Sequence, residues 1–312
     1  MIYLSPFVTR EDVENESRAI DKLRTDTPHA HIVRIFRHGW LKSVTRQNAP
    51  LPMYFIDMEL GDVSLEAHLK DLPGIPKRYD VFYIMLQVTA GLSFIHRNGM
   101  IHRDIKPANS RPTFLVTLIV IVILVGRGSR GPYHYPHWKI TDFGISTIGT
   151  SKRLIATRDA RGTAHYCAPE ILLSEAEIPS YTNKVDIWSV GLLLYELCTN
   201  KPMFQSANAV MRYFWEDQSI PRIPDIDHGT LISDRGKAYR RDISEVAVSI
   251  SHPFVISESS LSENFNECLK LLLQRDQQKR PSIENVNFHF AALRLYDAME
   301  VLPSWSGGKT KI

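Results

Sequence analysis

The alternation of apolar and polar residues divides the chain into a first part of mixed secondary structure and a longer, mainly helical part. Residues 10–23 place apolar side chains at helical spacing among charged neighbours, which predicts an amphipathic helix. Strands are expected at 31–36 and 53–60. Between them, the polar and proline-containing residues 45–52 favour a loop. The first part is therefore predicted to combine a helix with strands.

Beyond residue 61 the pattern is helical. A short helix is expected at 65–69 and a long one at 79–97, which the sequence Asn98-Gly99 ends because these residues readily adopt the left-handed conformation. Residues 181–199 are apolar on nearly every side, which predicts a fully buried helix. Further helices are expected at 210–215, 264–273 and 283–299.

The composition is that of an ordinary globular protein. Of 312 residues, 44% are hydrophobic and 23% are charged, which is enough for a sizeable core. The net charge of +3 does not indicate nucleic acid or a membrane as a partner. The three cysteines fit neither a disulfide framework nor zinc-ligand spacing, and residues 1–10 lack the pattern of a secretory leader. We therefore expect an intracellular protein, cytoplasmic or nuclear.

One short stretch, residues 102–109, combines three kinds of side chain that suit phosphoryl transfer. Asp104 offers a carboxylate, Lys106 an ammonium and Asn109 an amide. Transfer of a γ-phosphoryl group needs an orienting group for the attacking hydroxyl, a cation on the moving phosphate and ligands for magnesium. The stretch can supply one of each.

These eight residues resemble the catalytic loop of eukaryotic protein kinases, and the lysine two positions after the aspartate favours the serine/threonine branch. Partner motifs follow in the family's order. Asp-Phe-Gly stands at 142–144, Ala-Pro-Glu closes an activation segment at 168–170, and residues 186–191 match the start of the family's central helix. Four motifs in this order make coincidence negligible.

The resemblance implies an α+β, two-lobed fold, ATP and Mg²⁺ as cofactors, and serine or threonine hydroxyls of proteins as acceptors. In that fold Asp104 would orient the acceptor hydroxyl and accept its proton, and Lys106 would neutralise the moving phosphate. Asn109 and Asp142 would hold magnesium.

The same resemblance assigns the adenine site to the strand at 53–60. Met58 would guard the back of the adenine pocket, and Glu59 and Gly61 would offer backbone groups to the base.

Buried charges form a further set of implied contacts. Glu16 would pair with a lysine of an earlier strand, unless it is a solvated surface residue. Arg280 would meet Glu170, and removal of either partner from a buried pair would cost about 3–5 kcal/mol, whereas an exposed pair would contribute little. Asp186 would tie down the catalytic-loop backbone, because a buried carboxylate needs hydrogen-bond partners.

The activation segment carries several hydroxyl side chains among arginines and lysines. Arg103, next to Asp104, would receive a phosphate on this segment, and Thr157 is the candidate acceptor. Thr163 is expected to shape the substrate platform.

The sequence departs from the family in two places. No glycine-rich phosphate loop and no lysine precede Glu16, so ATP would lack its usual cover. Residues 110–136 also exceed the short connection that the family has here, and they contain a β-branched apolar run. A translated intron or a mis-assembled gene model is the preferred explanation, and a genuine strand that replaces the family's hairpin is the rival.

We therefore predict a truncated kinase amino-terminal lobe at 1–60, a carboxyl-terminal lobe at 61–302 with an anomalous insertion, and a tail at 303–312. The predicted function is that of a protein serine/threonine kinase whose activity is impaired in this chain. The alternatives are a pseudokinase scaffold and a non-functional fragment of a kinase gene. Oligomeric state, substrate and upstream activator stay open.

Overall fold

The computed structural model describes residues 2–3, 10–25, 27–46, 49–76, 78–107, 122–124, 137–152, 155–156, 163–172, 180–216, 219–224 and 261–301. Within these ranges the helices are α1 (Arg10–Leu23), α2 (Leu65–Asp71), α3 (Arg78–Arg97), α4 (Pro169–Leu172), α5 (Lys184–Thr199), α6 (Ala207–Trp215), α8 (Leu261–Leu272) and α9 (Ile283–Val301), with a 3-10 turn η1 (Gln277–Lys279).

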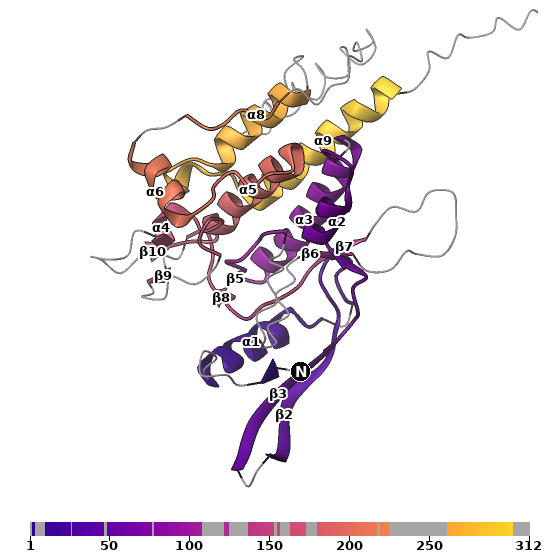
Figure 1. Ribbon diagram of the computed structural model, residues 1–312, viewed down its shortest axis with the longest axis vertical. Coiled ribbons are helices and arrows are strands. Elements are labelled where there is room, and N and C mark those ends of the chain that lie inside the picture. Colours follow the sequence, from indigo (N-terminus) through magenta and orange to yellow (C-terminus); the bar gives the residue numbers. More distant parts are fainter. Residues whose placement is uncertain are drawn as a thin grey trace, which may run out of the picture.

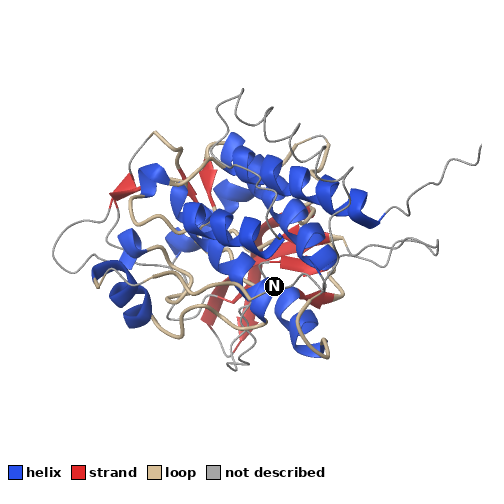
Figure 2. Cartoon of the chain, turned by 90° about the horizontal axis from the view of Figure 1, so that it is seen from above, coloured by secondary structure: helices blue, strands red, loops and turns tan. Residues whose placement is uncertain are grey.

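The strands are β1 (Ile2–Tyr3), β2 (Ile35–Arg46), β3 (Ala49–Met58), β4 (Val63–Ser64), β5 (Met100–Ile101), β6 (Val122–Leu124), β7 (Trp138–Ile140), β8 (Thr147–Ile148), β9 (Ile155–Ala156) and β10 (Ser180–Tyr181). The long hairpin β2–β3 projects from one end with α1 beside it (Figure 1). Seen from above, most helices gather in one body with short strands among them (Figure 2). The α+β prediction is confirmed.

The hairpin corrects two expectations about the first part of the chain. The predicted loop 45–52 lies almost wholly within strands, because Thr45 pairs with Pro50 and Arg46 with Ala49. The strand predicted at 31–36 begins only at Ile35. The β2–β3 ladder continues to the tip of the hairpin, so strand pairing overrode the turn preference of the prolines. β1 then adds to the other edge of β3.

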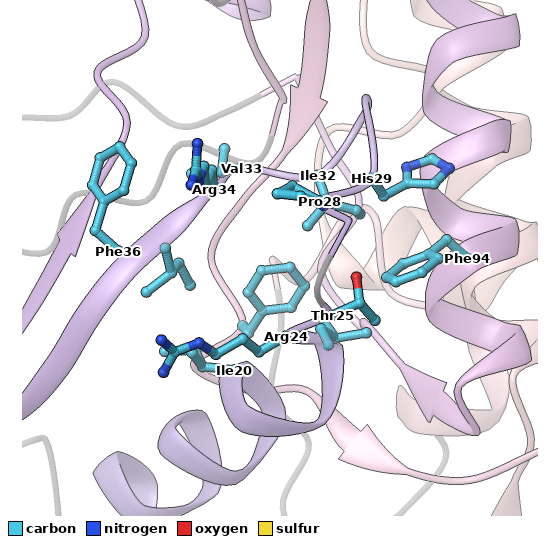
Figure 3. A pocket seen from close by; sticks show the side chains of 13 residues that line it. Ile20, Arg24, Thr25, Pro28, His29, Ile32, Val33, Arg34, Phe36 and Phe94 are labelled. Atoms are coloured by element: carbon cyan, nitrogen blue, oxygen red, sulfur yellow. The ribbon is translucent and has the colours of Figure 1, made fainter.

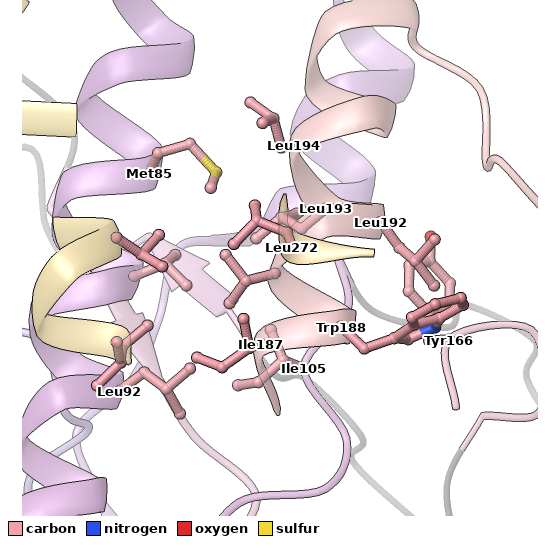
Figure 4. Close-up of a cluster of buried hydrophobic side chains, with 14 of the residues drawn as sticks. Met85, Leu92, Ile105, Tyr166, Ile187, Trp188, Leu192, Leu193, Leu194 and Leu272 are labelled. Atoms are coloured by element: carbon pink, nitrogen blue, oxygen red, sulfur yellow. The ribbon is translucent and has the colours of Figure 1, made fainter. Parts of the chain in front are cut away.

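The core of the helical part is built around α5, as the apolar pattern predicted. Trp188, Leu193 and Leu194 of this helix are fully buried. Figure 4 shows side chains of α5 meeting Met85 from α3 and Leu272 from α8. The observed helix begins at Lys184, three residues after the predicted start of 181. Continuous burial of this kind is the main favourable term in folding.

Two glycines permit features that larger residues would oppose. Gly99 follows α3 with φ +64°, so the predicted left-handed stop is confirmed. Gly91, within α3, faces the connecting segment before β2, and an added Cβ would lie 2.6 Å from the carbonyl oxygen of His31. The connecting segment therefore packs directly on α3.

The insertion between the catalytic loop and β7 contributes one described strand. β6 lies between β4 and β7, with Val122 opposite Ile140 and Val63 opposite Leu124. A paired strand is what the rival explanation, a genuine strand, predicted; residues 110–121 and 125–136 lie outside the described residues. None of the described helices is long and apolar enough to cross a membrane.

Candidate active site

Asp186, at the start of α5, organises the loop that follows β5. Its carboxylate accepts hydrogen bonds from the backbone N–H groups of His102 (2.9 Å) and Arg103 (2.7 Å) and from Nε2 of His96 (2.8 Å). The side chain is fully buried. Burial alone would raise the pKa of this carboxyl, but the hydrogen bond and charge of His96 lower it overall. Asp186 therefore stays ionised and fixes the loop backbone.

His102 joins this loop to the segment that carries Asp142. Its Nε2 donates to the carbonyl oxygen of Thr141 (3.0 Å), and its Nδ1 accepts from the backbone N–H of Asp104 (3.4 Å). Its ring also meets the ring of Phe143 edge-on, with centroids 5.5 Å apart. The two bonds require a neutral ring with the proton on Nε2. Two segments 40 residues apart in sequence are thereby held together.

Asp104 and Lys106 lie side by side in a nearly buried position. Lys106 Nζ is 2.7 Å from Asp104 Oδ2 and also bonds the hydroxyl of Thr163. The other oxygen of Asp104 accepts from the backbone N–H and from the hydroxyl of Thr163, both at 3.1 Å. Sequence reasoning missed this role of Thr163, because it depends on a contact between positions 59 residues apart. The three residues form one hydrogen-bonded cluster.

Asp142 holds an unusual backbone conformation, with φ +64°, and its carboxylate accepts the backbone N–H of Gly144 (3.2 Å). Burial raises the pKa of this carboxyl, and the charge of Asp104 adds to the rise. The carboxylates of Asp104 and Asp142 are the kind of oxygen donors that a hard divalent cation prefers. The donor chemistry therefore fits magnesium; Asn109 lies outside the described residues.

Glu16, on α1, approaches this region from the other side. Burial, and then the charge of Asp142, raise the pKa of its carboxyl to about 8. In the part of the chain that the structure describes, no lysine or arginine bonds Glu16. The helix is where the sequence predicted it, but Glu16 faces another carboxylate rather than a cation.

The end of β3 provides the proposed adenine-facing groups. The Met58 sulfur lies 3.9 Å from the Thr141 hydroxyl, so this side chain reaches the segment before Asp142. The backbone N–H of Glu59 donates to the carbonyl oxygen of Arg34 (2.9 Å). The carbonyl of Glu59 is therefore the backbone group that it can offer to a base. Gly61 lies in the described loop just beyond β3.

The Glu59 side chain has a structural partner that the sequence did not reveal. Its Oε1 is 2.6 Å from Lys139 Nζ and 2.7 Å from the backbone nitrogen of Arg34. Lys139 comes from β7, so this contact ties β3 to β7.

Arg103 has φ +72°, and its guanidinium bonds the carbonyl oxygen of Ile145 and the hydroxyl of Tyr181 (2.9 Å). Tyr181 belongs to β10, which pairs with β9. Thr157, the predicted phosphate acceptor, follows β9 directly but lies outside the described residues.

Arg280 and Glu170 form the pair that the sequence suggested. The guanidinium contacts both carboxylate oxygens, at 2.6 and 2.9 Å, and Arg280 is only 1% exposed. The geometry is bidentate, which is the strong form of this interaction. The pair closes the activation segment onto the turn before α9.

Comparison with known proteins identifies the family. The Protein kinase domain model matches residues 7–290. The chain belongs to the protein kinase domain family. It is 30% identical over 232 residues to Serine/threonine-protein kinase ATG1 of Gibberella zeae, covering 64% of this chain and 22% of that protein.

Two plant kinases are similar over larger shares of their own length. The kinase domain is 26% identical over 296 residues to Mitogen-activated protein kinase homolog NTF6 of Nicotiana tabacum, covering 94% of this chain and 70% of the relative. It is 31% identical over 199 residues to Cyclin-dependent kinase B2-1 of rice, covering 62% of this chain and 52% of the relative. The chain thus spans 22% to 70% of the length of these relatives.

Proposed function

We propose that this kinase domain transfers the γ-phosphoryl group of ATP to serine or threonine hydroxyls of protein substrates. The observation that carries the proposal is the hydrogen-bonded cluster of Asp104, Lys106 and Thr163, in which Asp104 lies close enough to Asp142 for its charge to help raise the pKa of Asp142. Phosphoryl transfer relies on positioning and electrostatics, and this cluster provides both.

In the proposed mechanism Asp104 accepts the hydrogen bond of the acceptor hydroxyl and takes its proton as the bond to phosphorus forms. Lys106, already beside Asp104, places its ammonium on the transferred phosphate and balances its charge. Asp142, with Asn109, would hold magnesium, which neutralises charge on the phosphates when bound. The carbonyl of Glu59 and the N–H of Gly61 would hold adenine behind Met58.

The relatives' names and the family support the serine/threonine class. We further propose residues 1–60 and 61–302 as the two lobes, action in the cytoplasm or nucleus, and regulation by a phosphate on Thr157 that Arg103 receives. The three cysteines are buried and form no disulfide, which agrees with a reducing compartment.

A second candidate, a scaffold that binds partners without phosphoryl transfer, is favoured by Glu16. Its carboxyl faces Asp142 and bonds no cation among the described residues. An ammonium at this position would otherwise grip the phosphates of ATP. We therefore propose that the chain retains phosphoryl transfer at a low rate.

The test uses the purified chain with Mg-ATP and a mixed serine/threonine peptide pool. Asp104→Asn should lower phosphate incorporation by at least about 100-fold, because the base is lost, while nucleotide binding measured by calorimetry stays unchanged. Asp57→Asn, an exposed aspartate on β3, is the matched control and should keep the parent rate.

Equal incorporation by the parent and Asp104→Asn would remove Asp104 from the proposed role. Nucleotide binding without any incorporation in the parent would favour the scaffold.

A further inference from the structure

A cavity of about 330 Å³ lies beside the carboxyl end of α1. Its walls come from α1, from the connecting residues 28–36 and from α3, and Phe143 also contributes. Figure 3 shows Ile20, Ile32 and Phe94 among the lining side chains, on different sides of the pocket. The volume lies in the range of roughly 300–1,000 Å³ that is usual for small-molecule sites.

Much of the wall is flat and aromatic. The rings of His29 and Phe94 stack with centroids 4.8 Å apart and 22° between their planes, and Phe36 leaves 46% of its surface exposed on another side. Burial, and then the charge of Arg97, lower the pKa of His29, so this ring is uncharged at neutral pH. Uncharged flat rings favour a flat aromatic partner through offset stacking.

The charge at the rim is positive. Arg24 and Arg34 line the cavity, and no aspartate or glutamate stands among the described lining residues. The guanidinium of Arg34 lies 5.4 Å from the centre of the Phe36 ring, whereas that of Arg24 has no hydrogen-bond or ion-pair partner within the described ranges. Figure 3 shows the two arginines on opposite sides of the centre. An anionic group would be attracted wherever it sits in the opening.

We propose that this cavity binds a small molecule with a flat aromatic body and one carboxylate. The rings lie against Phe94, His29 and Phe36, and the carboxylate meets a rim guanidinium. None of these ligand-contacting residues has a role in the proposed phosphoryl transfer, although Phe143 in the cavity wall adjoins Asp142. Contact with the aromatic walls of the apolar cavity provides affinity. The contact with a guanidinium makes the cavity select an acid over its neutral analogue.

The test is calorimetric titration of the full chain at pH 7.5 with naphthalene-2-carboxylate and, in parallel, with 2-naphthalenemethanol, which has the same rings without the charge. The acid should bind one molecule per chain and about three- to tenfold more tightly than the alcohol. The double variant Arg24→Gln/Arg34→Gln should remove this difference. The double variant Lys201→Gln/Arg212→Gln, which removes the same charge elsewhere, should keep it.

A third variant tests the location. Thr25 is an exposed lining residue, so Thr25→Trp should fill the entrance and abolish binding while the thermal unfolding temperature stays unchanged. Equal affinity of the two probes, an unchanged preference in the Arg24 and Arg34 variant, or binding that survives Thr25→Trp would each overturn the proposal. Tighter binding of a capped Phe-Asp dipeptide than of the naphthoate would also overturn it, because the cavity would then suit a protein partner.

Discussion

The helical part around α5 and the end of the molecule around α1 accommodate buried charge in opposite ways. In the helical part, Asp186 accepts hydrogen bonds from three donors, and Arg280 meets both oxygens of Glu170. At the α1 end, the carboxyl of Glu16 meets a second carboxyl, that of Asp142, and its pKa rises to about 8. Ionised groups are costly to bury unless they are paired: Asp186 and Glu170 have such partners, whereas no lysine or arginine bonds Glu16 within the described residues.

The two regions also differ in the size of their apolar cores. One large continuous core fills the helical part and takes in Ala19 and Leu23 of α1, whereas another side of α1 shares with β3 a separate small cluster of Val13, Ile20, Tyr54 and Ile56. A small cluster excludes little surface from water and therefore stabilises little. The helical part accordingly carries most of the stability, and the α1 end carries groups whose charge depends on what binds there.

The largest expected effect breaks the pairing in the helical part. Arg280→Ala should lower the free energy of unfolding by about 3–5 kcal/mol, because Glu170 is left as an unpaired carboxylate. Urea denaturation followed by circular dichroism measures it. Arg222→Ala is the matched control, since its pair with Glu263 is exposed and should be worth about 0–1 kcal/mol. Equal losses in the two variants would contradict the comparison.

A smaller effect is expected from Asp186→Asn, which keeps the shape of the side chain but removes its charge. The free energy of unfolding should fall by about 2–3 kcal/mol, because two backbone N–H groups and His96 no longer donate to an ionised acceptor. The same denaturation experiment applies. Asp57→Asn, whose pair with Arg37 is exposed, serves as control and should change stability little. A similar loss in both would show that Asp186 is not a special acceptor.

The smallest expected effect is a gain in stability, not a loss, and it concerns Glu16 at the α1 end. Because the folded-state pKa of Glu16 is raised from the ordinary 4.5 to about 8, folding is favoured by this group below pH 4.5, and that contribution is lost as pH rises to 8. Glu16→Gln should therefore change stability little at pH 5 and be stabilising at pH 8 in magnesium-free buffer, because glutamine brings no charge into the buried position.

Thermal unfolding at the two pH values measures this difference, with Glu14→Gln on the exposed side of α1 as control. A loss of stability at pH 8 would indicate that Glu16 is paired after all.

The sequence predicted most of the local structure, and its assignment of the candidate site residues stays a prediction. The helix at 10–23 was predicted and observed with the same bounds, and the buried helix was placed within three residues of its start. Both signals are local, since the spacing of apolar residues within a single helix determines which face is buried. The loop prediction at 45–52 was wrong, because a strand pair is decided by residues on its partner strand.

By itself, the sequence determined the helices, the order of the motifs and the family, since all of these depend on spacing along the chain. Only the tertiary structure decided which groups meet: Thr163 with one oxygen of Asp104, Lys139 with Glu59, and Glu16 with Asp142. Those contacts join distant segments, and no local pattern encodes their distances. The charge that each group carries depends on burial and on its neighbours, so protonation too is a property of the fold.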